Sequence, residues 1–154
     1  MTALAARSPM PTRDGRSQPR STAPIVAAVD DSSASGQAVD AAVRLAKELK
    51  AGLTFVYVRR GPPGLLGTPV FERRLAAKME RARRVLDRAL RSAARAGVEA
   101  EAEILEGSPQ KRITEFAGDR GARLVVVGSR RRKFGRSVSS RILRAANRPV
   151  VVAR

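Results

Sequence analysis

The residues best suited to bind a ligand lie in the C-terminal third of the chain. There the apolar run 124–127 ends in Gly128 and Ser129, and the basic stretch 130–136 then leads to Ser137 at the start of an expected helix. In an open α/β sheet, ligands bind beyond the carboxyl ends of the strands, because backbone N–H groups in the loop and at the helix start are free to meet an anion. The segment therefore predicts a site for an anionic ligand, with phosphate as the expected group.

The composition excludes several kinds of chemistry. The chain of 154 residues has no cysteine and no histidine, which removes disulfides, thiolate nucleophiles, imidazole bases and the usual zinc ligands. Catalysis would have to use carboxylates, lysine or hydroxyl groups. No apolar run approaches the roughly 20 residues of a membrane span, and the N-terminus lacks the apolar core of a signal peptide. We expect a cytoplasmic protein that does not engage a membrane.

The charge is strongly positive and unevenly distributed. The chain carries 31 Lys and Arg against 14 Asp and Glu, a formal net charge of +17, and its last 35 residues hold eleven basic residues and no acidic one. Such a field attracts phosphates, nucleic acid or another polyanion. A GC-rich coding bias would also produce much arginine and alanine, so the charge is either functional or compositional. Few aromatic residues are present for the stacking surfaces that single-strand binders use.

The pattern along the chain predicts one folded domain behind a basic tail. Residues 1–22 mix Pro, Ser, Thr and Arg without periodicity, which is typical of a disordered tail, and the domain covers 23–154. The segment 98–105 alternates apolar residues with glutamates and is expected at a sheet edge. Apolar runs at strand length alternate with helical patterns, which favours a parallel sheet covered on both faces, a doubly wound α/β fold. The expected strands are 24–29, 53–58, 98–105, 124–127 and 150–153. The expected helices are one that follows Ser33 and stops near Gly52, and those at 71–96, 108–120 and 138–146.

In their order and spacing, several short motifs resemble the universal stress protein family. The matching residues are Val29-Asp30 with Ser32, Gly107-Ser-Pro109, Val126-Val-Gly-Ser-Arg130, Ser137-Val-Ser139, Ile142-Leu-Arg144 and Pro149-Val-Val-Val152. The resemblance covers about residues 23 to 154. It implies a five-stranded parallel sheet in the order 3-2-1-4-5 with helices on both faces, commonly a homodimer, and ATP binding in one subgroup.

The resemblance also implies which residues would hold ATP. Adenine would lie near the ends of the first two strands, and the triphosphate would lie at the loop after the fourth strand. The implied residues are Asp30, Ser32, Val56, Gly128, Ser129, Arg130, Gly135, Ser137 and Val138. No metal ligand is among the expectations.

The chain departs from the ATP-binding pattern at three glycine positions. Arg131 and Arg136 stand where the family has glycines that let the backbone approach phosphate, and Asp31 replaces another glycine and adds a negative charge. We therefore expect ATP to bind weakly or not at all. The alternative is that the arginines of 130–136 hold phosphates electrostatically.

The favoured function is a binding or regulatory module of the stress response without an assigned reaction. One alternative is a basic adaptor that binds nucleic acid or another polyanion through the 71–96 helix and the 130–136 loop. A second is a slow ATPase, with Asp30 as the only well-placed carboxylate. The apolar edge Val150–Val152 further predicts a homodimer formed through the last strand.

Overall fold

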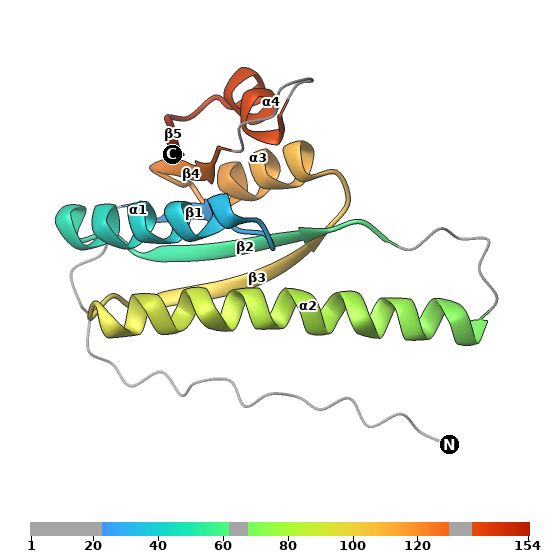
Figure 1. The fold of residues 1–154 in the computed structure, drawn as a ribbon. Helices are drawn as coiled ribbons and strands as arrows, with labels where there is room; N and C mark the ends of the chain where they lie inside the picture. Colours follow the sequence, from blue (N-terminus) through green and yellow to red (C-terminus); the bar gives the residue numbers. More distant parts are fainter. Residues whose placement is uncertain (1–22, 62–67, 130–136) are drawn as a thin grey trace, which may run out of the picture.

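The described residues form a parallel sheet with helices packed on both of its faces (Figure 1). The computed structural model describes residues 23–61, 68–129 and 137–154, so the predicted tail 1–22 and the basic loop 130–136 lie outside the described residues. The five strands are ordered β3-β2-β1-β4-β5, which confirms the fold and the strand order that the resemblance implied. In chain order the elements are β1 (Ile25–Ala28), α1 (Ser33–Leu49), β2 (Leu53–Arg59), α2 (Thr68–Arg95), β3 (Ala100–Glu106), α3 (Pro109–Asp119), β4 (Leu124–Gly128), α4 (Val138–Ala145) and β5 (Val150–Ala153).

β1 and β4, two strands without charged residues, lie in the interior of the sheet. β1 pairs with β2 on one side and with β4 on the other, and its Ile25, Val26 and Ala27 are fully buried. Strands covered on both faces need apolar residues at successive positions, because each face meets a helix layer. β3 pairs only with β2 and carries the alternating glutamates at the edge, as the pattern predicted.

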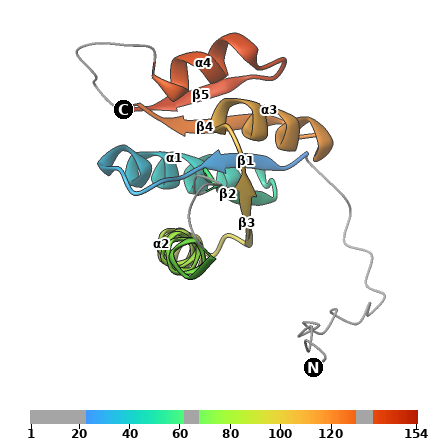
Figure 2. The same cartoon turned by 90° about the vertical axis from the view of Figure 1, so that its right-hand side faces the viewer.

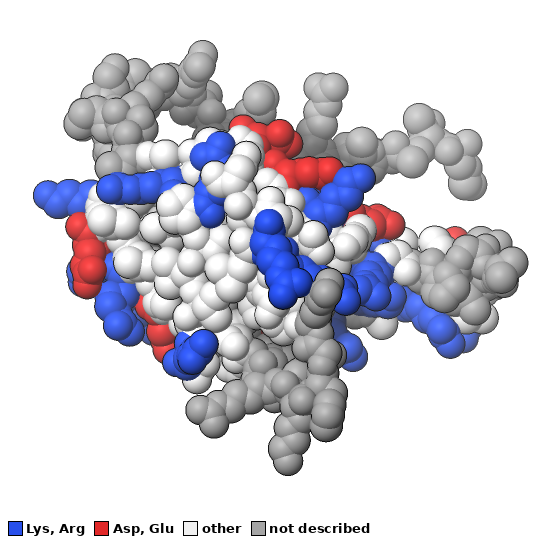
Figure 3. All heavy atoms as spheres, turned by 90° about the horizontal axis from the view of Figure 1, so that it is seen from above, with Lys and Arg blue, Asp and Glu red and all other residues white. Residues whose placement is uncertain are grey.

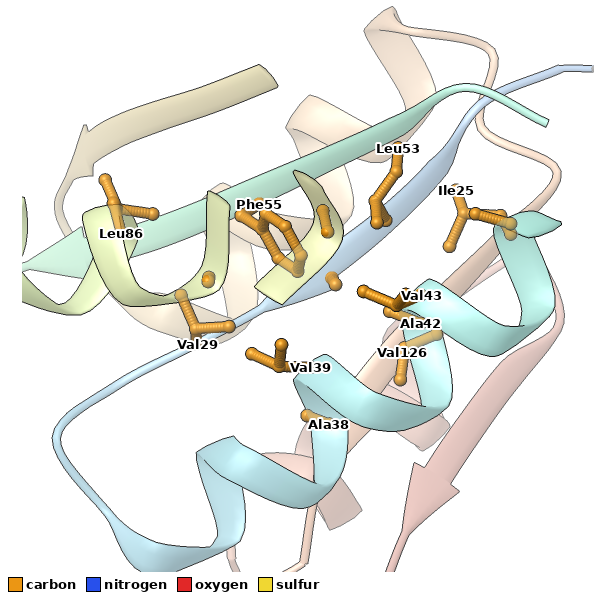
Figure 4. Packing of buried hydrophobic residues seen from close by; sticks show 14 of the residues in the cluster. Ile25, Val29, Ala38, Val39, Ala42, Val43, Leu53, Phe55, Leu86 and Val126 are labelled. Atoms are coloured by element: carbon orange, nitrogen blue, oxygen red, sulfur yellow. The ribbon is translucent and has the colours of Figure 1, made fainter. Parts of the chain in front are cut away.

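Two separate apolar cores hold the helices to the sheet. α1 and α2 cover one face, and α3 and α4 cover the other, as the end-on view shows (Figure 2). In the first core, Phe55 of β2 points toward the same space as Val39 of α1 and Leu86 of α2 (Figure 4). In the second core, the buried Ile142 of α4 packs with Val56 of β2. Successive residues of β2 therefore pack in opposite cores, because successive side chains of a strand point to opposite faces of the sheet.

α2 is the longest element and is only partly covered by the sheet. Its 28 residues span roughly 42 Å at 1.5 Å per residue. Its fully buried side chains lie in the C-terminal half, at Ala82, Val85, Leu86, Ala89 and Ala93. The helix begins at Thr68, three residues before the predicted start, with a proline in its first turn where no hydrogen-bonded N–H is needed.

α1 and α2 are each followed by a residue in the left-handed backbone region. α1 stops at Leu49, and Lys50 follows with φ 49°, so the helix ends before the predicted stop near Gly52. After α2, Gly97 adopts φ 72°, a conformation that costs a residue with a Cβ atom but not glycine.

Two Gly→Ala variants test whether the positive φ of Gly97, and not a lack of room for a side chain, requires glycine at that position. Neither Gly97 nor Gly36, which lies inside α1, has an atom within 4 Å of an added Cβ. Gly97→Ala is expected to lower the free energy of unfolding by about 1 kcal/mol because of its positive φ. Gly36→Ala is expected to raise it by about 0.5–1 kcal/mol because alanine is the better helix former. Urea unfolding measures both, and shifts of the same sign would contradict the assignment.

Candidate functional site

A cavity opens at the carboxyl ends of the central strands, where the chain leaves β1 toward one face of the sheet and β4 toward the other. This topological switch point is where open α/β sheets bind ligands. The cavity has a volume of about 510 Å³, within the range of small-molecule sites. Its lining comes from β1, β2, β4, α3, α4 and the turn before α1: Ala28, Val29, Asp30, Ser32, Ser35, Val56, Val58, Arg60, Pro109, Ile113, Val127, Gly128, Ser137, Val138, Ser139, Arg141 and Ile142.

The turn after β1 fixes the carboxylate of Asp30 at the cavity. Its Oδ1 accepts a hydrogen bond from the backbone N–H of Ser32 at 2.8 Å and another from the Ser32 hydroxyl. The Asp30 N–H donates to the Ser35 hydroxyl at 3.0 Å. Ser32 occupies the N-cap position of α1, but its side chain makes no cap hydrogen bond, because its hydroxyl donates to Asp30 instead. The turn is thus organised around one carboxylate.

The neighbouring carboxylate of Asp31 is engaged with α2. The Oδ2 atom of Asp31 lies 3.4 Å from Nε of Arg81, and Asp31 is not part of the cavity lining. The pKa of Tyr57 on β2 is raised, first by burial and then by the Asp31 carboxylate, with the Arg81 charge acting in the opposite direction. Tyr57 therefore stays protonated at neutral pH and contributes no negative charge beside this turn.

The start of α4 brings three serine hydroxyls together, and two of these serines, Ser137 and Ser139, line the cavity. Ser137 is the N-cap residue, and its Oγ accepts the Ser140 N–H at 3.1 Å. The same Oγ lies 2.8 Å from the hydroxyls of Ser139 and Ser140. A helix N-terminus carries a partial positive charge and unpaired N–H groups, and hydroxyls can donate to an anion. This corner of the cavity is suited to a phosphate or carboxylate.

Two arginines add positive charge to the cavity wall. Arg141 follows Ser137 by one turn of α4, and Arg60 follows the end of β2. Both residues are exposed. The backbone carbonyl of Arg60 accepts a hydrogen bond from Nζ of Lys78 at 2.9 Å, which ties the wall of the cavity to α2.

Gly128 is required by packing within the protein itself. A Cβ atom at this position would lie 2.3 Å from the backbone oxygen of Ala34 and 2.8 Å from its carbonyl carbon. Real Cβ atoms do not approach backbone so closely, so the end of β4 and the first turn of α1 meet here without room for a side chain. The glycine is explained without any ligand.

The structure brings together most of the residues that the resemblance implied. Asp30, Ser32, Val56, Gly128, Ser137 and Val138 all line the cavity. Ser129 does not, and its N–H donates to the carbonyl of Ala153 at 2.9 Å as part of the β4–β5 ladder. Arg130 and Gly135 lie outside the described residues.

Sequence reasoning missed four polar residues of the lining: Ser35, Arg60, Ser139 and Arg141. Arg141 could have been found, because residues four apart on a helix share a face and Ser137 had been recognised. Nothing in the sequence marked Arg60, which reaches the cavity only because β2 continues to Arg59.

The described residues contain neither a metal-binding group nor a membrane-spanning helix. Within the ranges 23–61, 68–129 and 137–154, no group of three or more acidic side chains is placed to hold a metal ion. None of the helices in these ranges is long and apolar enough to cross a membrane.

Comparison with known proteins points to one family. Residues 22–154 match the model of the universal stress protein family. The universal stress protein YxiE of Bacillus subtilis is 33% identical over 145 residues, covering 84% of this chain and 97% of the relative. A universal stress protein family structure from Burkholderia pseudomallei superposes with a TM-score of 0.71 at 33% identity, covering 87% of this chain and 98% of that one. The universal stress protein of Archaeoglobus fulgidus in complex with dAMP has a TM-score of 0.69 at 24% identity, covering 86% of this chain and 98% of that one.

The packing role of Gly128 gives a prediction that needs no ligand. Gly128→Ala is expected to lower the free energy of unfolding of the ligand-free protein by about 1–3 kcal/mol, because α1 or β4 must move to admit the methyl group. Gly52→Ala is the matched control, since its added Cβ would meet only Pro24 at an ordinary 3.8 Å. Urea unfolding followed by circular dichroism measures both variants. Equal stability of the two would show that the contact with Ala34 is not limiting.

Proposed function

Because this chain belongs to the universal stress protein family, we propose that it is a regulatory module of the stress response that binds a nucleoside monophosphate at the switch-point cavity. The observation that carries the proposal is the arrangement of three kinds of surface in one cavity. The apolar wall suits the base, and the single carboxylate suits the polar edge of the nucleoside. The corner of hydroxyls and cations suits the phosphate.

The apolar wall and the carboxylate suit the nucleoside. Ala28 and Val58, two half-buried residues of the lining, offer an aliphatic surface for a purine ring. The Asp30 carboxylate, held by the turn after β1, can accept a hydrogen bond from an amino or hydroxyl group of the nucleoside. Asp30 is the only acidic residue among the described cavity residues, and Ser32 already engages its Oδ1 atom, so we propose binding rather than hydrolysis.

The start of α4 suits one phosphate group. The hydroxyls of Ser137 and Ser139, the N-terminus of the helix and the Arg141 guanidinium all border the same corner. A relative with this fold holds dAMP, a nucleotide with one phosphate. Arg131 and Arg136 replace the glycines that approach the further phosphates in the ATP-binding pattern. We therefore propose that ATP binds more weakly than a nucleoside monophosphate. We also propose that the protein is cytoplasmic, because such nucleotides are found in the cytoplasm.

Calorimetry with matched variants tests this site. Arg141→Gln is expected to weaken AMP binding about tenfold, since removal of a charge-assisted hydrogen bond of about 1.4 kcal/mol has that effect. Arg144→Gln removes the same charge from the same helix but lies outside the cavity lining, so AMP affinity should stay within about twofold. Adenosine lacks the phosphate and should bind wild type and Arg141→Gln alike.

Three outcomes would contradict the proposal. The first is that neither AMP nor adenosine binds the wild-type protein. The second is an equal loss of AMP affinity in both arginine variants, which would indicate a general charge effect. The third is ATP binding in the low micromolar range and tighter than AMP, which would make the triphosphate the ligand and show that the arginines replace the missing glycines.

We further propose that the protein is a homodimer formed through β5. This strand pairs with β4 on one side only, and its Val150, Val151 and Val152 are half-buried. α4, which contacts β5, carries the exposed apolar residue Leu143. Seen from the side of α4 and β5, the centre of the molecule is largely uncharged and Lys and Arg lie around it (Figure 3). An uncharged edge of this kind favours pairing with a second copy.

Sedimentation tests the dimer. The wild type is expected at twice the 16.5 kDa chain mass at tens of micromolar. Val125 N–H donates to the Pro149 carbonyl and Ser129 N–H to the Ala153 carbonyl, so by the alternation of a parallel ladder the outward N–H groups of β5 are those of Val150 and Val152. Val152→Pro removes one outward donor and should shift the protein toward monomer with little change in circular dichroism. A wild type that sediments only at the chain mass would refute the dimer.

A further inference from the structure

The outer surface of α2 carries a row of exposed arginines, which we name the arginine face: Arg73, Arg81, Arg84, Arg88, Arg91 and Arg95. The last four of these are spaced by four, three and four residues, which places them on one side of a helix. From the first to the last, the face extends roughly 33 Å at 1.5 Å per residue. It lies opposite the buried side of α2, which packs on β2 and β3.

Compared with α1 and α3, α2 carries a large excess of basic over acidic residues. α2 contains nine Lys and Arg against three acidic residues. α1 contains two basic and two acidic residues, and α3 also contains two of each. A coding bias toward arginine acts on codons without regard to position in the fold, so it would load all three helices. A uniform coding bias therefore does not explain the difference between α2 and the helices α1 and α3.

Within the protein, most of the arginine face is not neutralised. Arg81 pairs with Asp31 at 3.4 Å, and Arg84 approaches Glu80 at 3.8 Å. For Arg88, Arg91 and Arg95, no carboxylate of the described residues lies within 4.0 Å. Exposed like charges repel one another and add nothing to the stability of the fold. The face is therefore better explained by an external anion than by folding.

We propose that the arginine face binds the phosphate backbone of a nucleic-acid duplex without sequence preference. Its length is close to one turn of B-form DNA, roughly 34 Å, so several phosphates can be contacted at once. α2 contains no Asn, Gln or Trp and its only aromatic residue is Phe71, so it lacks most side chains that read or stack on bases. Arginine pairs well with phosphate oxygens through its fork of N–H groups.

The surroundings of α2 favour a nucleic acid over a lipid surface. A helix that lies in a membrane interface inserts its apolar side into lipid. In the C-terminal half of α2, which carries Arg84, Arg88, Arg91 and Arg95, that side is occupied, because Ala82, Leu86 and Ala89 are buried against the sheet. The β3 edge with α2 also lies at the other end of the sheet from β5 (Figure 2). A dimer formed through β5 would leave both arginine faces open.

Two variants with equal charge change test the proposal. One replaces Arg84, Arg88, Arg91 and Arg95 by Gln, and the other replaces Arg44, Lys47, Lys111 and Arg123, exposed residues away from α2, by Gln. Fluorescence anisotropy with a labelled 20-base-pair DNA duplex is measured between 50 and 200 mM NaCl. The α2 variant should bind about tenfold or more weakly at 150 mM salt, and its log–log salt slope should fall by about 0.9 for each phosphate that is no longer neutralised. The control should keep its affinity within about twofold.

Further measurements distinguish binding at the arginine face from binding at the cavity and from a general charge effect. Unchanged AMP affinity and circular dichroism in the α2 variant would show that the weaker duplex binding is specific to the face. Equal weakening in both variants would reduce the effect to net charge and overturn the proposal. A wild-type dissociation constant no tighter than roughly 10⁻⁴ M at 150 mM salt would also overturn it. Tighter binding to vesicles of phosphatidylserine and phosphatidylcholine than to the duplex would assign the face to membranes instead.

Discussion

The contact between the end of β4 and the first turn of α1 is the constraint on which the cavity depends. Because Gly128 has no side chain, the backbone of Ala34 can approach it closely, and α1 can cross over both β1 and β4. α4 then has to pack on the opposite face, with Ile142 in the second core. The two chain segments leave the sheet in opposite directions, and the space between them becomes the cavity.

α2 connects this cavity to the outer surface of the protein. Lys78 donates to the carbonyl of Arg60 at the end of β2, and Arg81 pairs with Asp31 in the turn after β1. Both contacts come from the N-terminal half of α2, where the sheet covers the helix least. The helix that carries the arginine face thus contacts the rim of the cavity through polar groups. Salt and charge changes weaken such contacts more than they weaken apolar packing.

The same residue type has different consequences in the two proposed sites. At the cavity, Arg141 stands beside serine hydroxyls and a helix N-terminus, which together define the position of one phosphate. On α2, arginines lie beside one another along a regular helix. They produce a positive electrostatic potential along the helix, without a defined pocket. The first arrangement selects a small ligand by geometry, and the second attracts an extended polyanion by charge.

The sequence by itself determined the strands, the edge position of β3 and the helix layers on both faces of the sheet, and it predicted the loop after β4 as the place of a site. The charge-free runs of β1 and β4, the alternating glutamates of β3 and the glycine and serine positions after β4 all act through local periodicity and backbone preference, which can be read along the chain. Only the tertiary structure decided what Gly128 contacts, that Asp31 pairs with Arg81, and that Arg60 and Arg141 share a cavity. These contacts join segments far apart in sequence, and their geometry depends on how the helices pack on the sheet.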